Sequence, residues 1–240
     1  LTGTPSRFIG QVGNDNLGEQ LCASLRGSGV HVCTVAEGRT GSIVVVATSD
    51  GERTMLTDRG DATALSTYDH EWLADVTTLH VPMYSFSHEP ISTATRNLVL
   101  AARQQHIRVS VDASSVTVIE QLGASHVQQL LSSLQPDVLL CTRSEAAALG
   151  VTQHEHLGAA TVVVKDGPRP VQVYGNDGTT SEFDVTAVDT VVDGTGAGDA
   201  FAAGFLLALA RQAALSECVA QAQVVAAQVV GRAGATLEDE

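Results

Sequence analysis

The stretch VVDGTGAGDAFAAGF, at residues 191–205, places small residues and an acid directly before an apolar run. Residues 200–210 carry no charged or polar side chain, which predicts a helix that is buried nearly all round. The N-terminus of such a helix offers unpaired N–H groups and the positive end of the helix dipole. Gly196, Ala197 and Gly198 would let a bulky anion approach that backbone closely. The stretch therefore predicts a phosphate-binding turn.

Asp199 follows these small residues directly. A carboxylate beside a bound phosphate is repelled, so its presence there indicates a chemical role. A hydroxyl group that attacks phosphorus needs a nearby base, and Asp199 fits that role. The alternative is a first-turn acid that only complements the helix dipole, as in many helices.

Two well-known phosphate-binding loops do not match this turn. A Walker loop requires Gly-Lys-Ser/Thr, and no lysine follows these glycines. A dinucleotide-binding fingerprint requires G-x-G-x-x-G after an early strand, whereas here the third glycine comes one residue early and near the end of the chain. A nicotinamide-dependent dehydrogenase is therefore disfavoured.

The elements that must position this turn alternate between strands and helices. Short β-branched runs are typical of buried strands, and the Leu17, Leu21 and Leu25 repeat predicts a helix. Such alternation predicts an α/β fold with a doubly wound, mostly parallel sheet flanked by helices. The expected strands are residues 7–10, 78–81, 108–111, 137–140 and 161–164, and further helices are expected at 91–105 and 124–134.

Polar side chains follow four successive expected strands, the last being a run at VDTVV (188–192). Ligands of open α/β sheets bind outside the carboxyl ends of the strands, so these residues are expected to gather at one site. Each alone could be an ordinary cap or turn residue. The residues are Asp112, Cys141, Thr142, Glu145, Lys165, Asp166, Gly167 and Asp193.

The stretch GSIVVVATSDGERTML, at residues 41–56, interrupts the alternation. It holds two β-rich runs around Asp50-Gly51, which is a hairpin turn signal. An antiparallel hairpin in an α/β chain favours an appendage such as a lid. The alternative is an edge hairpin of the main sheet.

The composition narrows the class of partner. The 240 residues include 13 Lys and Arg against 27 Asp and Glu, for a net charge of −14. Such a surface repels nucleic acid and anionic membranes, so neither is an expected partner. Four scattered cysteines without C-x-x-C spacing favour reduced thiols in a cytoplasmic protein.

Residues 191–205 resemble the signature of the PfkB (ribokinase-like) carbohydrate kinases, D-T-x-G-A-G-D followed by an apolar helix. Further segments agree with that family, namely FIGQVGNDNLGEQL, DGERTMLTDRG, VSVDAS and SEAAALG. The resemblance implies a single ribokinase-like α/β domain over residues 1–240, with residues 41–59 as part of a β lid. A homodimer through that lid is also implied.

By this resemblance, Asp199 is the catalytic base that takes a proton from an acceptor hydroxyl while the γ-phosphate of ATP is transferred. Gly196, Ala197 and Gly198 would form the anion hole for that phosphate. The acceptor would be a small sugar, sugar acid or nucleoside. The residues expected to line its side are Arg59, Gly60 and Asp112.

The resemblance also assigns the nucleotide and the metals. Glu145 matches a glutamate associated with Mg²⁺ through water, and Asp193 with Thr195 lies where the family often binds a monovalent cation such as K⁺. The expected nucleotide-binding residues are Thr142, Lys165, Gly167 and Gln223.

The sequence departs from the family pattern at several of these positions. Gly194 replaces a usual Thr, Thr142 stands where the N-x-x-E motif has Asn, Lys165 replaces a common Thr, and Gln223 falls where Asn is usual. The family's opening strand with a substrate-binding Asp, and its Gly-Gly loop, do not precede RFIGQVG. We therefore expect an N-terminal strand and loop to be missing from these residues.

The sequence thus predicts an ATP-dependent kinase of a small hydroxylated acceptor. Two alternatives stay open. One is a nucleotide- or sugar-binding protein of the same fold that has lost turnover, which the departures suggest. The other is an unrelated α/β anion-binding enzyme that shares only the glycine turn.

Overall fold

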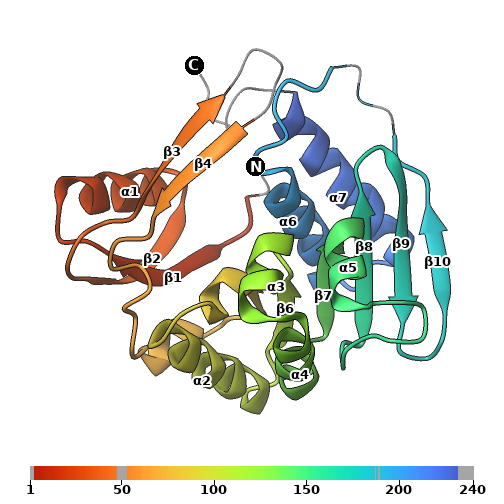
Figure 1. Cartoon of the computed structure of the whole chain (residues 1–240), viewed down its shortest axis with the longest axis horizontal. Coiled ribbons are helices and arrows are strands. Elements are labelled where there is room, and N and C mark those ends of the chain that lie inside the picture. Colours follow the sequence, from red (N-terminus) through yellow and green to blue (C-terminus); the bar gives the residue numbers. More distant parts are fainter. Residues whose placement is uncertain (1–2, 48–52, 187, 189, 232–240) are drawn as a thin grey trace. The chain divides into compact units, whose positions relative to one another are not determined.

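The computed structural model describes residues 3–47, 53–186, 188 and 190–231 (Figure 1). The chain divides into two compact units. The larger unit takes Val76–Tyr84 and the residues from Val99 on, and the smaller takes Gly3–Asp75 and Ser85–Leu98. The helix α2 (Ile91–Gln104) and the short 3₁₀ helix η2 (Met83–Phe86) each contain a boundary between the units.

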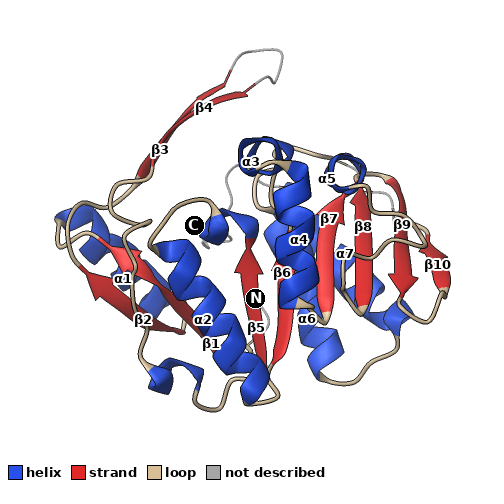
Figure 2. Ribbon diagram, turned by 60° about the horizontal axis from the view of Figure 1, so that its bottom comes forward, coloured by secondary structure: helices blue, strands red, loops and turns tan. Residues whose placement is uncertain are grey.

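The larger unit is built on a six-stranded sheet with the order β10-β9-β8-β7-β6-β5. The four strands β5 to β8 run parallel, and β9 and β10 extend the sheet antiparallel (Figure 2). The predicted mostly parallel α/β sheet is confirmed. Its strands are β5 (Thr78–Pro82), β6 (Arg108–Asp112), β7 (Val138–Thr142), β8 (Thr161–Asp166), β9 (Arg169–Gly175) and β10 (Thr180–Phe183).

Helices cover both faces of this sheet. The pair α6 and α7 packs on one face, while α3, α4 and α5 lie on the other (Figures 1 and 2). These helices are α3 (Val116–Leu122), α4 (Ala124–Leu134), α5 (Arg143–Leu149), α6 (Ala197–Ala210) and α7 (Leu215–Val230). The helix α6 therefore packs against both the sheet and α7.

The helix α6 is buried because its sequence offers no polar face. Phe205 is fully buried, and with Phe201 it packs against strand residues Leu140 and Val163. On its other side, Gly204 brings α6 close to α7. A Cβ atom at Gly204 would lie 2.7 Å from the Cα atom of Ala222 and 2.8 Å from the carbonyl oxygen of Gln221. This close packing fixes where the N-terminus of α6 lies within the unit.

We expect Gly204→Ala to destabilise the protein. Alanine favours a helix over glycine by about 1 kcal/mol, but the added methyl group would contact backbone atoms, and such overpacking costs about 1–3 kcal/mol. Urea unfolding should report a lower free energy of unfolding. The matched control is Gly27→Ala in a helix of the smaller unit, where the added Cβ meets no atom within 4 Å. Equal or higher stability for Gly204→Ala would contradict the close packing.

The smaller unit holds the strands β1 (Ser6–Val12) and β2 (Val30–Ala36), which pair in parallel and are joined by α1 (Asn16–Gly27). The Asp15 carboxylate caps α1 by accepting from the N–H of Gly18 at 2.9 Å and also accepts from the Thr40 hydroxyl at 2.6 Å. These hydrogen bonds, that of Thr40 first, lower the pKa of Asp15 to about 2. A 3₁₀ helix, η1 (His70–Leu73), lies in the same unit.

The expected hairpin is present as the two-stranded antiparallel sheet of β3 (Ser42–Ala47) and β4 (Arg53–Asp58). Its turn at Asp50-Gly51 lies outside the described residues. Apolar side chains are exposed along it, and they are Ile43, Val44, Val45, Val46 and Leu56.

Two sequence expectations need correction. The helix at Leu17, Leu21 and Leu25 is confirmed as α1, but its buried residues are Gly18 and Cys22, and Leu17 and Leu21 are exposed.

The expected strand at 188–192 is wrong, because residues 188 and 190–192 form no strand. Val191 and Val192 are 68% and 52% exposed, so this β-branched run is not buried. The antiparallel β9 and β10 occupy the sheet beyond β8, and the N–H groups of Val192 and Asp193 donate to the Val230 carbonyl oxygen instead.

Candidate functional site

The carboxyl ends of β6, β7 and β8 bring several predicted site residues together in the larger unit. Asp112 ends β6, Thr142 ends β7, and Lys165 lies one residue before the end of β8. In the sheet register Asp112 pairs with Leu140, and Thr142 pairs with Lys165. These three residues therefore lie at one edge of the sheet, as the sequence predicted.

Asp112 and Lys165 form an ion pair across the end of β7. The Lys165 Nζ atom lies 2.9 Å from Oδ2 of Asp112, and each side chain is only 12% exposed. The other carboxylate oxygen of Asp112, Oδ1, accepts from the N–H of Ser114 at 2.7 Å. Both carboxylate oxygens of Asp112 thus have partners within the protein, which the sequence did not predict.

The N-terminus of α6 lies next to this ion pair. Gly196 adopts a left-handed conformation with φ of 79° and supplies no side-chain cap. Within the described part of the chain, the N–H groups of Gly198 and Asp199 donate to no acceptor. Unpaired N–H groups at the positive end of a long helix form an anion-binding site.

The Lys165 ammonium group lies beside this same turn. A Cβ atom built on Gly198 would lie 3.5 Å from Nζ, and Nζ lies 5.9 Å from the ring centroid of Phe201 in α6. Asp199, one residue beyond Gly198, is exposed. A cation, unpaired N–H groups and a solvent-facing carboxylate therefore meet at the start of α6.

Glu145 has a structural role that explains its burial. Its Oε2 accepts from the N–H of Thr142 at 2.7 Å, and the Thr142 hydroxyl accepts from the N–H of Glu145 at 3.3 Å. This reciprocal pair is a capping box at the start of α5. The Glu145 side chain is buried, and burial together with its carboxylate raises the pKa of the Cys141 thiol. The remaining oxygen of Glu145 is the one with capacity for another ligand.

The loop before α6 is ordered by Asp193, whose Oδ1 accepts from the N–H of Thr195 at 2.7 Å. Asp193 and Thr195 each take part in a further interaction. Gly167 adopts φ of 59° directly after β8, and a Cβ there would meet open space. Gln223 in α7 donates to the Asp184 carbonyl oxygen at 2.9 Å. Among the described residues, no group of three or more His, Cys, Asp and Glu side chains could hold a metal ion.

Arg59 and Gly60 lie in the smaller unit, directly after β4. Gly60 has φ of 50°, and a Cβ there would lie 2.4 Å from the Arg39 carbonyl oxygen, so this turn requires glycine. The Asp58 carboxylate accepts from the Gly60 N–H at 3.0 Å and pairs with Arg39, which lowers the pKa of Asp58 to about 2. These contacts hold the base of the hairpin.

His80 in β5 is a further titratable residue near this site. Its Nδ1 lies 3.2 Å from Oγ of Ser110. Burial lowers the pKa of His80, and the charges of Asp112, Asp199 and Lys165 act on it as well. The imidazole therefore lies near the same charged cluster. His80 lies within the strand predicted at 78–81, and in the register it pairs with Ser110, two residues before Asp112.

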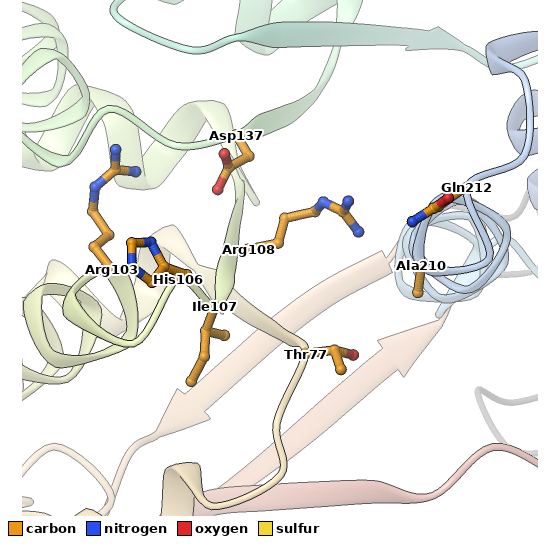
Figure 3. A pocket seen from close by; sticks show the side chains of 8 residues that line it. All are labelled: Thr77, Arg103, His106, Ile107, Arg108, Asp137, Ala210 and Gln212. Carbon is orange, nitrogen blue, oxygen red and sulfur yellow. The ribbon is translucent and has the colours of Figure 1, made fainter.

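A separate pocket of about 420 Å³ lies at the opposite edge of the sheet, where β6 and β7 begin (Figure 3). It contains none of the predicted site residues. Its lining residues are Thr77, Arg103, His106, Ile107, Arg108, Asp137, Ala210 and Gln212.

Comparisons with known proteins agree with this arrangement. The chain is 28% identical to an uncharacterized sugar kinase of Archaeoglobus fulgidus over 97% of this chain and 94% of that protein. The solved adenosine kinase of Sinorhizobium meliloti shares the fold, with a TM-score of 0.87 and 24% identity over 98% of this chain and 75% of that one. An E. coli protein solved in complex with ATP and Mg²⁺ has a TM-score of 0.83 and 22% identity over 98% and 79%.

No helix in the described residues is long and apolar enough to cross a membrane.

The model of the pfkB family carbohydrate kinases matches residues 1–240. This match spans the turn at Gly196–Gly198, Asp199 and the strand ends that surround them. The chain therefore belongs to the pfkB family of carbohydrate kinases.

Proposed function

We propose that this protein transfers the γ-phosphate of ATP to a hydroxyl group of a small sugar, sugar acid or nucleoside, with Asp199 as the base. The observation that carries the proposal is the start of α6. There, unpaired N–H groups, the Lys165 ammonium group and an exposed carboxylate lie together. The first two attract a phosphate, and the third is suited to accept a proton from an attacking hydroxyl.

In this reaction Asp199 takes the proton of the acceptor hydroxyl as its oxygen bonds to the γ-phosphorus and the bond to ADP breaks. The backbone of Gly196, Ala197 and Gly198 holds the transferred group, because the helix dipole and N–H groups stabilise its negative charge. The proton on Asp199 passes to solvent after the transfer, since this side chain is exposed, and the N–H groups act only as hydrogen-bond donors.

The nucleotide is assigned to the adjacent strand ends and loops. Thr142, Lys165 and Gly167 follow or end β7 and β8, and Gln223 lies in α7. The positive φ and open space at Gly167 would allow the backbone to lie along the phosphates.

Magnesium would be held by phosphate oxygens and water, and the second carboxylate oxygen of Glu145 would bind it through one of these waters. Mg²⁺ is typically bound through one or two carboxylates together with substrate phosphates and water, so one protein carboxylate suffices. When bound, the ion would neutralise charge that develops on the phosphate oxygens.

Glu145→Gln should separate the capping role of Glu145 from its metal role. Glutamine can still accept from the Thr142 N–H, so thermal stability should change little. Loss of the charge should raise the Mg²⁺ concentration for half-maximal rate by about tenfold or more. Glu145→Ala, as the comparison variant, should also lose about 1 kcal/mol of stability. A normal Mg²⁺ dependence in both variants would remove Glu145 from the metal site.

The acceptor is proposed from the relatives, whose names include a sugar kinase and an adenosine kinase. Arg59 and Gly60 are assigned to its side of the site. Formation of ADP with Mg-ATP and a panel of sugars, sugar acids and nucleosides tests the function. Turnover that depends on one acceptor supports it, whereas tight nucleotide binding without any turnover favours the impaired binding protein.

Further features of the proposed enzyme each have a direct test. Asp193 and Thr195 are assigned to a K⁺ site, so the rate of phosphoryl transfer should be higher in KCl than in NaCl.

The exposed apolar side chains of β3 and β4 favour a homodimer through this lid, which sedimentation velocity would detect. The four cysteines form no disulfide, in keeping with a cytoplasmic protein, and labelling in intact cells would locate it.

A further inference from the structure

The face of the sheet that packs on α6 carries a row of polar residues toward its carboxyl edge. His80 pairs in register with Ser110, and Asp112 follows Ser110 by two residues, so these three share one face. Asp112 pairs with Leu140, which packs against α6. Lys165 follows Val163 of that same cluster by two residues. The ion pair of Asp112 and Lys165 therefore lies on the α6 side, directly above the apolar core.

We propose that Asp112 is a positioning residue that holds the Lys165 ammonium group against the first turn of α6, where Lys165 contacts the transferred phosphoryl group. This inference rests on the proposed kinase function and revises the expectation that Asp112 lines the acceptor side. Both oxygens of Asp112 are already engaged, by Lys165 at 2.9 Å and by the Ser114 N–H at 2.7 Å. The carboxylate is thus oriented toward the lysine and its own loop.

The charges around Lys165 favour the binding of an anion at the first turn of α6. The ammonium group and the positive end of the α6 dipole repel one another, and the Lys165 side chain is only 12% exposed, so solvent screens its charge weakly. Asp112 is the one carboxylate in ion-pair contact with Lys165 in the described structure. A dianionic phosphoryl group at the N–H groups of Gly198 and Asp199 would relieve the remaining positive potential. The site is therefore built to bind negative charge as it develops.

Asp112 is needed because lysine has a flexible four-carbon stem and makes no fixed fork of hydrogen bonds. His80 cannot replace it as an anchor, because its Nδ1 is engaged with Ser110 and its burial favours the neutral form. The aromatic ring of Phe201 also attracts the Lys165 ammonium group through a cation–π interaction. Loss of Asp112 would thus leave the Lys165 ammonium group near the first turn of α6 but without a fixed position.

Steady-state kinetics of four variants test this role. Lys165→Met should lower kcat by about 10²–10³-fold, the cost of removing one such charge stabiliser. Asp112→Asn should lower kcat by about 10–10²-fold while the KM of the acceptor changes little, because misplacement of a catalytic group is costly. The double variant should match Lys165→Met, since the aspartate acts through the lysine. Arg108→Met, which removes one charge at the far end of the same strand, is the control and should be unchanged.

Different outcomes overturn different claims. If Asp112→Asn raises the acceptor KM and leaves kcat unchanged, Asp112 binds the acceptor and the inference is wrong. Independent effects in the double variant would also overturn it. If Asp112→Asn does not fold, Asp112→Glu keeps the charge, displaces it by one methylene group, and should show the same selective loss of kcat.

A binding measurement makes this test independent of turnover. Calorimetric titration with Mg-ADP and aluminium fluoride, which mimics the transferred group, should show about tenfold or weaker binding for both Lys165→Met and Asp112→Asn. Wild-type affinity in both variants would overturn the inference. A wild-type protein that binds this mimic but phosphorylates no acceptor would contradict the proposed function instead.

Discussion

Asp199→Asn should lower kcat by about 10²–10⁴-fold, because general-base catalysis contributes an effect of that order. Asp199 is exposed in the first turn of α6, so the substitution should not disturb packing. Asparagine keeps the shape and size of the side chain but accepts protons poorly. ATP should still bind, since the N–H groups of the turn are unchanged. Initial rates of ADP formation with the best acceptor, together with nucleotide titration, give both quantities.

The matched control for this prediction is Glu217→Gln in α7. Glu217 is also an exposed acid in the first turn of a long helix, but it lies outside the candidate site. Its loss should cost only the dipole contribution, about 0.3–1 kcal/mol of stability, and leave kcat unchanged. Equal and small effects of both substitutions would mean that Asp199 serves the helix dipole alone.

Phe205→Ala should lower the free energy of unfolding by about 3–5 kcal/mol, which is typical when a buried phenylalanine is truncated. Phe205 is fully buried in the cluster that joins α6 to the sheet and α7. Its neighbours in that cluster are apolar, so water in the vacated space would find no hydrogen-bond partner among them. Urea unfolding, followed by circular dichroism, measures the change.

Leu100→Ala is the control for this loss, since Leu100 is 53% exposed in α2. Its effect should stay within about 0.5 kcal/mol. If Phe205→Ala costs no more than this control, α6 is not anchored by the core as described.

The sequence predicted the elements whose pattern is local. The apolar run from Ala200 to Ala210 and the β-branched runs carry their periodicity within a few residues, so α6 and the parallel strands were recognised. The strand predicted at 188–192 was wrong because β-branched residues also occur in exposed extended segments. No local feature of the sequence shows that β9 and β10 extend the sheet beyond β8.

The candidate site was predictable only as a set of strand ends. Asp112 and Lys165 are 53 residues apart, and their pairing depends on the register of three strands. That register is fixed by packing across the sheet, which the sequence pattern does not give. The capping box of Thr142 and Glu145 is, by contrast, a local signal in TRSE, and a cap was the stated alternative to a role of these two residues in the site.

A single-turnover transfer experiment tests whether the start of α6, with Asp199, performs phosphoryl transfer. Excess enzyme is mixed with γ-³²P-labelled Mg-ATP and each acceptor, quenched, and separated by chromatography. We expect label to pass to one sugar, sugar acid or nucleoside in the wild type, and to pass at least about 10²-fold more slowly in Asp199→Asn. Equal transfer rates in the two proteins, or label released only as inorganic phosphate, would contradict it.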